Sequence, residues 1–175
     1  GYTGPLPTPG KHFILMTAHR RESFGQGFED ICEAVSRIAA RGDTEIIYPV
    51  HPNPNVRGVV ERKLKGVAGI HLIEPLDYVP FVDLMRRADI LLTDSGGVQE
   101  EGPSLRKPVL VMRDKTERQE AVEAGTARLV GTDPDRIFNE VAALLDDPRP
   151  YDLPNPFGDG QACPRIADAI LRHLS

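Results

Sequence analysis

The segment 93–101, TDSGGVQEE, combines residue types that can bind a phosphate. Glycines let a backbone approach an anion closely, and free N–H groups at a helix N-terminus supply donors and a favourable dipole. Ser95 and Gly96 are therefore predicted phosphate ligands. Glu101, one helical turn further on, is predicted to accept hydrogen bonds from ribose hydroxyls. The alternative is that the turn only caps a helix and that Glu101 is a solvated acid of its first turn.

Two other segments place histidines beside arginines or prolines. In 19–23, HRRES, the arginine forks could bind a diphosphate, and an imidazole changes its charge near neutral pH. We interpret this cluster, which includes His19 and Arg21, as functional, although it could also be a solvated loop. In 50–55, VHPNPN, prolines hold His51 in a rigid loop. The alternative for His51 is a histidine that hydrogen-bonds its own turn.

The segment 113–118, RDKTER, supplies one more cation. Arg118 is a predicted phosphate ligand at the start of a helix that we expect to begin near Glu117. The alternative is an ordinary charged loop with a surface ion pair at helical spacing.

Each polar segment follows an apolar run that is typical of a buried strand. Between these runs, apolar residues recur at helical spacing, as Phe28, Ile31 and Val35 do. Strands are predicted at 12–18, 45–50, 70–73, 89–93, 108–112 and 127–130, and helices at 27–40, after Pro54, around 81–88, after 97, near Glu117, at 134–145 and at 166–174.

Strands that alternate with helices predict a three-layer α/β domain of the Rossmann-like type, with a parallel sheet of about six strands. In such sheets, ligands bind outside the carboxyl ends of the strands, so the four polar loops should meet at one edge. We assign residues 1–11, with three prolines and three glycines, to a linker or remnant. Residues 12–146 form the predicted domain, and 147–175 a proline-rich connection and a C-terminal helix.

Composition excludes several classes of protein. The formal charge of −5 and a pI of about 5.5 disfavour a nucleic-acid partner. No apolar run is long enough for a membrane helix and no secretory signal is visible, so we expect no membrane partner and a cytoplasmic location. Cys32 and Cys163 lack metal-ligand spacing, and neither a P-loop nor a dinucleotide fingerprint occurs, so we expect no metal and no cofactor.

Together these motifs resemble the non-hydrolysing UDP-N-acetylglucosamine 2-epimerases. The resemblance extends from about residue 11 to the end of the chain. One departure is Gln119, which stands where many members have proline. The matching motifs are HRRE at 19–22, YPVH at 48–51 with NP at 53–54, TDSGG at 93–97 with Glu101, KPVLVMRD at 107–114, TER at 116–118, EAGT at 123–126 and LVGT at 129–132.

The resemblance implies a fold like one half of the GT-B glycosyltransferases, with UDP held by this half and the sugar in the cleft between the halves. At the matching positions it implies that Ser95 and Gly96 hold the diphosphate, that Arg118 contacts the phosphates and that Glu101 binds the ribose. Phe81 would lie beside the uracil.

Three more positions match functional residues of the family. His19 matches its active-site histidine. Arg21 and His51 match an allosteric site at which some bacterial members bind a second UDP-N-acetylglucosamine. The implied partners are UDP, a UDP-N-acetylhexosamine, an N-terminal domain that is missing here, and a second copy in a homodimer.

The family reaction interconverts UDP-N-acetylglucosamine and UDP-N-acetylmannosamine for polysaccharide biosynthesis, by elimination and re-addition of UDP. Its proton-transferring carboxylates belong to the N-terminal domain, so the isolated chain should be inactive. Two alternatives stay open: the nucleotide-binding half of a UDP-sugar glycosyltransferase, and a non-catalytic module that binds nucleotide sugars.

Overall fold

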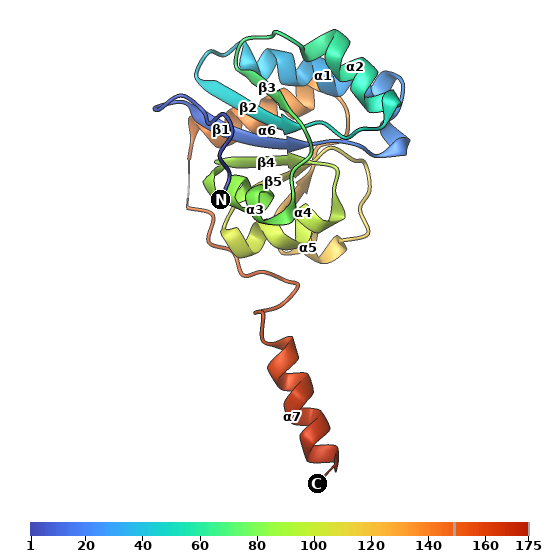
Figure 1. Ribbon diagram of the computed structural model, residues 1–175, viewed down its shortest axis with the longest axis vertical. Helices are drawn as coiled ribbons and strands as arrows, with labels where there is room; N and C mark the ends of the chain where they lie inside the picture. The colour runs from blue at the N-terminus through green and yellow to red at the C-terminus, as the bar shows by residue number, and fades with distance from the viewer. Residues whose placement is uncertain (149, 175) are drawn as a thin grey trace.

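The computed structural model describes residues 1–148 and 150–174, which form one parallel sheet with helices on both faces (Figure 1). The strand order β3-β2-β1-β4-β5-β6 is the doubly wound order of dinucleotide-binding folds. The strands are β1 (His12–Thr17), β2 (Thr44–Pro49), β3 (Ile70–Ile73), β4 (Ile90–Thr93), β5 (Val109–Val111) and β6 (Ala127–Leu129). The helices are α1 (Gln26–Ala39), α2 (Pro54–Leu64), α3 (Tyr78–Arg87), α4 (Gly96–Glu101), α5 (Gln119–Glu123), α6 (Pro134–Asp146) and α7 (Ala162–Leu174).

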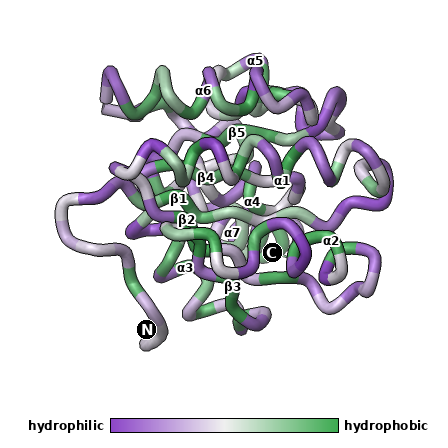
Figure 2. Tube along the Cα trace, turned by 90° about the horizontal axis from the view of Figure 1, so that it is seen from above, coloured by the Kyte–Doolittle hydropathy of each residue, from purple (hydrophilic) through white to green (hydrophobic). Residues whose placement is uncertain are grey.

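The sheet is buried on both faces because its strands are apolar at nearly every position. In β1, Ile14 and Met16 point into a core formed with α1, α2 and α6. Phe13 and Leu15 point into a second core with α3, α4 and α5. Side chains of a strand alternate between faces, so continuous apolar runs require cover on both sides. Figure 2 shows these hydrophobic strand segments between the helices.

Two helices on the first face begin in the same way. Asn53 precedes α2, and its side chain accepts the N–H of Asn55. Asp133 precedes α6 and accepts the N–H of Arg136 in the same manner. In both helices the first residue is proline, which is suited to a position whose missing N–H has no partner within the helix.

The predicted elements are confirmed, with small shifts at their ends and two corrections. The helix expected near Glu117 begins at Gln119, because Thr116 and Arg118 belong to a loop. The last helix, expected at 166–174, begins earlier, at Ala162, so Pro164 lies in its first turn, where proline is tolerated.

The strand order brings the predicted polar loops side by side. β2, β1, β4 and β5 are consecutive neighbours, so the loops that follow them leave one edge of the sheet in a row. Thr17 pairs with Thr93 at the ends of β1 and β4, and the N–H of Asp94 donates to the carbonyl of Thr17 at 3.1 Å. Backbone hydrogen bonds between β1 and β4 therefore continue as far as Asp94, which directly precedes the predicted phosphate ligands.

Helix α7 lies apart from the sheet at the end of the 147–161 connection (Figure 1). Every residue in Ala162–Leu174 is exposed, and Ile166, Ile170 and Leu174 are 58%, 53% and 78% exposed. Among residues 1–148 and 150–174, no helix is long and apolar enough to cross a membrane. An amphipathic helix with an exposed apolar side lacks the burial from which helices in proteins gain most of their stability.

Two isoleucine substitutions would test this separation. Ile31→Ala in α1, where Ile31 is fully buried, should lower the free energy of unfolding by about 2–5 kcal/mol. Ile170→Ala in α7 should change it by less than about 0.5 kcal/mol. Urea denaturation of both variants measures the difference, and similar losses would show that α7 packs on the domain.

Candidate functional site

A hollow of about 240 Å³ opens at the carboxyl edge of the sheet. Four predicted site residues line it: His19 from the loop after β1, His51 from the loop after β2, Phe81 from α3, and Ser95 from the loop after β4. Its other walls are mainly apolar, including Leu76. An apolar hollow with a few convergent polar groups is the usual form of a small-molecule site.

His19 is held by a carboxylate from the neighbouring strand end. Asp94 is fully buried, and its Oδ2 accepts the backbone N–H groups of His19 and Arg20, both at 2.6 Å. Its Oδ1 lies 3.3 Å from His19 Nδ1. In the sequence Asp94 is one residue of a polar turn with no predicted role, because only the β1–β4 pairing brings it to the histidine.

His51 lies directly against His19. The two rings stack with their centroids 5.3 Å apart and an interplanar angle of 15°. His51 Nδ1 accepts the N–H of Asn53 at 3.1 Å, which is the turn hydrogen bond given above as the alternative for this histidine. That bond does not remove His51 from the hollow, since its ring also lines it.

The turn between β4 and α4 is packed against a cation. Ser95 precedes α4, but its hydroxyl makes no capping hydrogen bond. A Cβ atom on Gly96 would lie only 2.9 Å from Arg118 Cζ, so a larger residue at this position would displace the guanidinium that lies over this turn. Arg118 Nε donates to Glu100 Oε1 at 2.8 Å. The structure thus brings together Ser95, Gly96 and Arg118.

Glu101 lies beside α3 and does not line the hollow itself. Its Oε2 accepts a hydrogen bond from the Tyr78 hydroxyl at 3.2 Å. The negative charge of Glu101, and then this hydrogen bond, raise the pKa of Tyr78 above its ordinary value. Tyr78 therefore remains a donor to the carboxylate at neutral pH. Tyr78 was missed by the sequence analysis, although it lies only three residues before Phe81.

Buried hydrogen bonds fix the backbone that carries Arg118. The Thr116 hydroxyl donates to Gln99 Oε1 at 2.6 Å and accepts the N–H of Arg118 at 3.1 Å. Gln99 Nε2 donates in turn to the carbonyl of Ser95 at 3.1 Å. Thr116 and Gln99 are 5% and 0% exposed, so these bonds are shielded from water. They join the loop after β5 to the turn before α4.

Arg113 connects the loop after β5 to the loop after β1. Its nearly buried guanidinium pairs with Glu22 and with both carboxylate oxygens of Glu117, at 2.9 and 3.0 Å. Hydrogen bonding to Arg113 lowers the pKa of Glu117 to about 2. Arg21, next to Glu22, is exposed in a short 3-10 helix and is not among the residues that line the hollow with His51.

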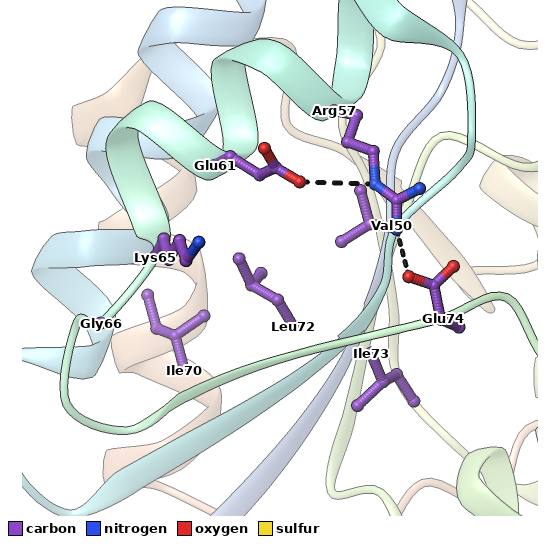
Figure 3. A pocket seen from close by; sticks show the side chains of 9 residues that line it. All are labelled: Val50, Arg57, Glu61, Lys65, Gly66, Ile70, Leu72, Ile73 and Glu74. Atoms are coloured by element: carbon purple, nitrogen blue, oxygen red, sulfur yellow. Dashed lines mark hydrogen bonds and ion pairs between the residues drawn. The ribbon is translucent and has the colours of Figure 1, made fainter.

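Another hollow lies between α2 and the edge strand β3 (Figure 3). Arg57 spans it and pairs with Glu61, at 3.5 Å, and with Glu74. None of the predicted ligand residues lines it, and its arginine is already neutralised by two carboxylates. Among residues 1–148 and 150–174, no group of three or more His, Cys, Asp or Glu side chains could hold a metal ion.

Comparison with known proteins finds relatives along nearly the whole of this chain. A family model described as UDP-N-acetylglucosamine 2-epimerase matches residues 4–171. A Ralstonia solanacearum relative is 61% identical over 170 residues, which cover 94% of this chain and 45% of the relative. UDP-N-acetylglucosamine 2-epimerase of Escherichia coli K12 is 58% identical over 171 residues, covering 95% and 46%.

Solved structures give the same result. The crystal structure of UDP-GlcNAc 2-epimerase from Neisseria meningitidis bound to UDP-GlcNAc is 43% identical, with a TM-score of 0.88, and the match covers 95% of this chain and 46% of that one. The predicted Rossmann-like fold, one half of a GT-B-like architecture, is confirmed. The chain spans about half the length of the relatives that it matches.

The hydrogen bond between Thr116 and Gln99 can be tested by a double-mutant cycle. Thr116→Val leaves the buried Gln99 Oε1 without its donor and should cost about 1–3 kcal/mol in the free energy of unfolding. Thr116→Val combined with Gln99→Met removes both polar groups and should recover part of that loss. Urea denaturation of Thr116→Val, Gln99→Met and the double variant measures the free energy of unfolding of each. If the loss in the double variant equals the sum of the losses in the two single variants, the two side chains are not coupled.

Proposed function

Because the chain belongs to the UDP-N-acetylglucosamine 2-epimerase family, we propose that it is the UDP-binding half of an enzyme that interconverts UDP-N-acetylglucosamine and UDP-N-acetylmannosamine. The observation that carries the proposal is the meeting of His19, Phe81 and Ser95 around one hollow at the carboxyl edge of the sheet. Ligands of doubly wound folds bind at this edge.

In this proposal the diphosphate, the uracil and the ribose of UDP each have a binding group at the site. The diphosphate would lie at Ser95 and Gly96, within reach of Arg118, because that guanidinium already lies over the glycine. Phe81 offers an aromatic wall for the uracil. Glu101 offers its carboxylate oxygens to the ribose hydroxyls. The Tyr78 hydroxyl orients this carboxylate by donating a hydrogen bond to Oε2.

The proposed reaction needs stabilisation of the charge that develops when UDP leaves the sugar. Oriented N–H groups and cations do this well, because they need little rearrangement as the charge forms. The turn at Ser95–Gly96 and the Arg118 guanidinium supply both kinds of group. His19, which lines the same hollow, would act at the active site. Carboxylates that move the proton at C2 of the sugar would come from the other half.

Helix α7 supports the proposal that another half is needed. Its apolar residues Ile166, Ile170 and Leu174 are exposed, and the relatives are about twice as long as this chain. We infer that α7 packs on the missing N-terminal half, with a second copy of the chain as the alternative. His51 and Arg21 would take part in an allosteric site only if that half completes it, because Arg21 does not line the hollow here.

UDP binding tests the proposed site through two neighbouring glycines. Gly96→Ala places a Cβ 2.9 Å from Arg118 Cζ, which displaces the flexible guanidinium and should weaken UDP binding about tenfold or more. Gly97→Ala is the matched control, because its Cβ would meet only Ser95 Oγ, at 3.8 Å. Calorimetric titration measures both affinities. Equal effects in the two variants, or no UDP binding by the unmodified chain, would contradict the placement of the diphosphate.

Activity tests the division of labour between the halves. The purified 175-residue chain should bind UDP but produce no UDP-N-acetylmannosamine from UDP-N-acetylglucosamine, because the proposed proton-transferring carboxylates would belong to the other half of the relatives' length. Product formation followed by NMR measures this. Epimerisation by the chain alone would show that the other half is dispensable.

A further inference from the structure

We propose that Asp94 is a positioning residue that holds His19 in a single tautomer, with the hydrogen on Nδ1 and with Nε2 left for the ligand. The geometry of the two side chains carries this inference. Its bearing on the reaction rests on the proposed function.

The two oxygens of Asp94 differ in their partners. Oδ2 accepts two backbone N–H groups, from His19 and Arg20, at 2.6 Å each. Oδ1 is buried and has no hydrogen-bond partner within residues 1–148 and 150–174. It lies 3.3 Å from His19 Nδ1, slightly beyond the usual length of a hydrogen bond. Since a buried acceptor without a donor is costly, Oδ1 favours the tautomer in which Nδ1 carries the hydrogen.

The backbone around His19 is fixed, so its ring has little freedom to avoid Asp94. The buried Tyr48 hydroxyl donates to the carbonyl of Ala18 at 2.8 Å. Asp94 accepts the next two N–H groups along the chain. The Thr17 and Thr93 hydroxyls hydrogen-bond each other at 2.6 Å just behind. Catalytic hydrogen bonds are often long before a ligand binds and shorten in the complex, as we expect for the contact between Asp94 and His19.

His51 restricts the movement of the His19 ring by stacking on its face. The stacked rings lie 5.3 Å apart, and His51 Nδ1 is already an acceptor for the N–H of Asn53. A neutral His51 therefore carries its hydrogen on Nε2. In both histidines Nδ1 thus interacts with another group of the protein. The Nε2 atom of His19 is then a hydrogen-bond acceptor, whereas that of His51 is a donor.

This arrangement has a chemical consequence at the hollow. An imidazole whose Nδ1–H faces a carboxylate can accept a proton at Nε2, and the carboxylate then stabilises the imidazolium. The same Nε2 can later return the proton to a departing oxygen. With the opposite tautomer, Nε2 would carry a hydrogen from the start and could not accept one.

Asp94→Asn tests the tautomer with little change in shape. The amide oxygen can still accept the N–H groups of His19 and Arg20, while the amide nitrogen replaces Oδ1 and cannot accept from Nδ1–H. We therefore expect the Nδ1–H tautomer of His19 to be lost in favour of Nε2–H. The matched control is Asp89→Asn, at the residue immediately before β4. Like Asp94, Asp89 accepts a backbone N–H, that of Phe13 at 2.7 Å, and lies near a histidine, 3.8 Å from His12 Nδ1.

Imidazole nitrogen NMR of the whole chain identifies the tautomers, at about pH 8.5, where an ordinary imidazole is neutral. His19→Gln assigns the signals. The expected result is Nδ1–H in the unmodified chain and in Asp89→Asn, and Nε2–H in Asp94→Asn. Nε2–H in the unmodified chain overturns the proposal even if Asp94→Asn does not fold, and so does an unchanged tautomer in a folded Asp94→Asn.

A titration with UDP separates this inference from the proposed function. UDP should shift the Nε2 signal of His19 more than its Nδ1 signal. Absence of UDP binding contradicts the proposed function but leaves the tautomer result valid. A UDP-induced shift confined to Nδ1 contradicts the claim that Nε2 is left for the ligand.

Discussion

The buried carboxylate of Asp94 connects the ends of two neighbouring strands, and the arrangement of the site depends on that connection. β1 and β4 are adjacent, so the residue after β4 can accept hydrogen bonds from the loop after β1. Asp94 is fully buried, so the two N–H groups that its Oδ2 accepts offset part of the cost of burying the carboxylate and make the loop conformation part of the fold. His19 therefore lies where the strand order places it.

Two cations of the site, Arg113 and Arg118, are paired with carboxylates of the chain itself. Arg118 contacts Glu100, and Arg113 contacts Glu22 and Glu117. These pairs differ in burial: Arg113 is nearly buried, whereas the Arg118 side chain is 32% exposed. If the buried guanidinium of Arg113 lost its carboxylate partners, its charge would be left uncompensated. Arg113 is therefore suited to connecting the two loops and not to binding a ligand. Arg118 can exchange its carboxylate for a phosphate at lower cost, because water reaches the pair.

The sequence predicted the elements and the edge at which they converge. Continuous apolar runs such as 12–17 require burial on both faces, and this local pattern survives folding almost unchanged. The side-chain pairs could not be predicted, because Arg113 and Glu22 are 91 residues apart and Asp94 and His19 are 75 apart. Such pairs depend on strand order and loop conformation, which no local spacing encodes. Tyr78 was missed for the same reason: its partner Glu101 lies on another helix.

The proposed half-enzyme separates the binding of the leaving group from the transfer of the proton. A rigid edge, braced by the buried hydrogen bonds of Thr116 and Gln99, can hold a diphosphate with little rearrangement when charge develops on it. In the proposed function, the groups that act on the sugar carbon would come from the other half of the enzyme. Helix α7, with its exposed Ile166 and Ile170, offers apolar surface to that half. In this arrangement the catalytic geometry depends on how the two halves meet, while the affinity for UDP depends on this half.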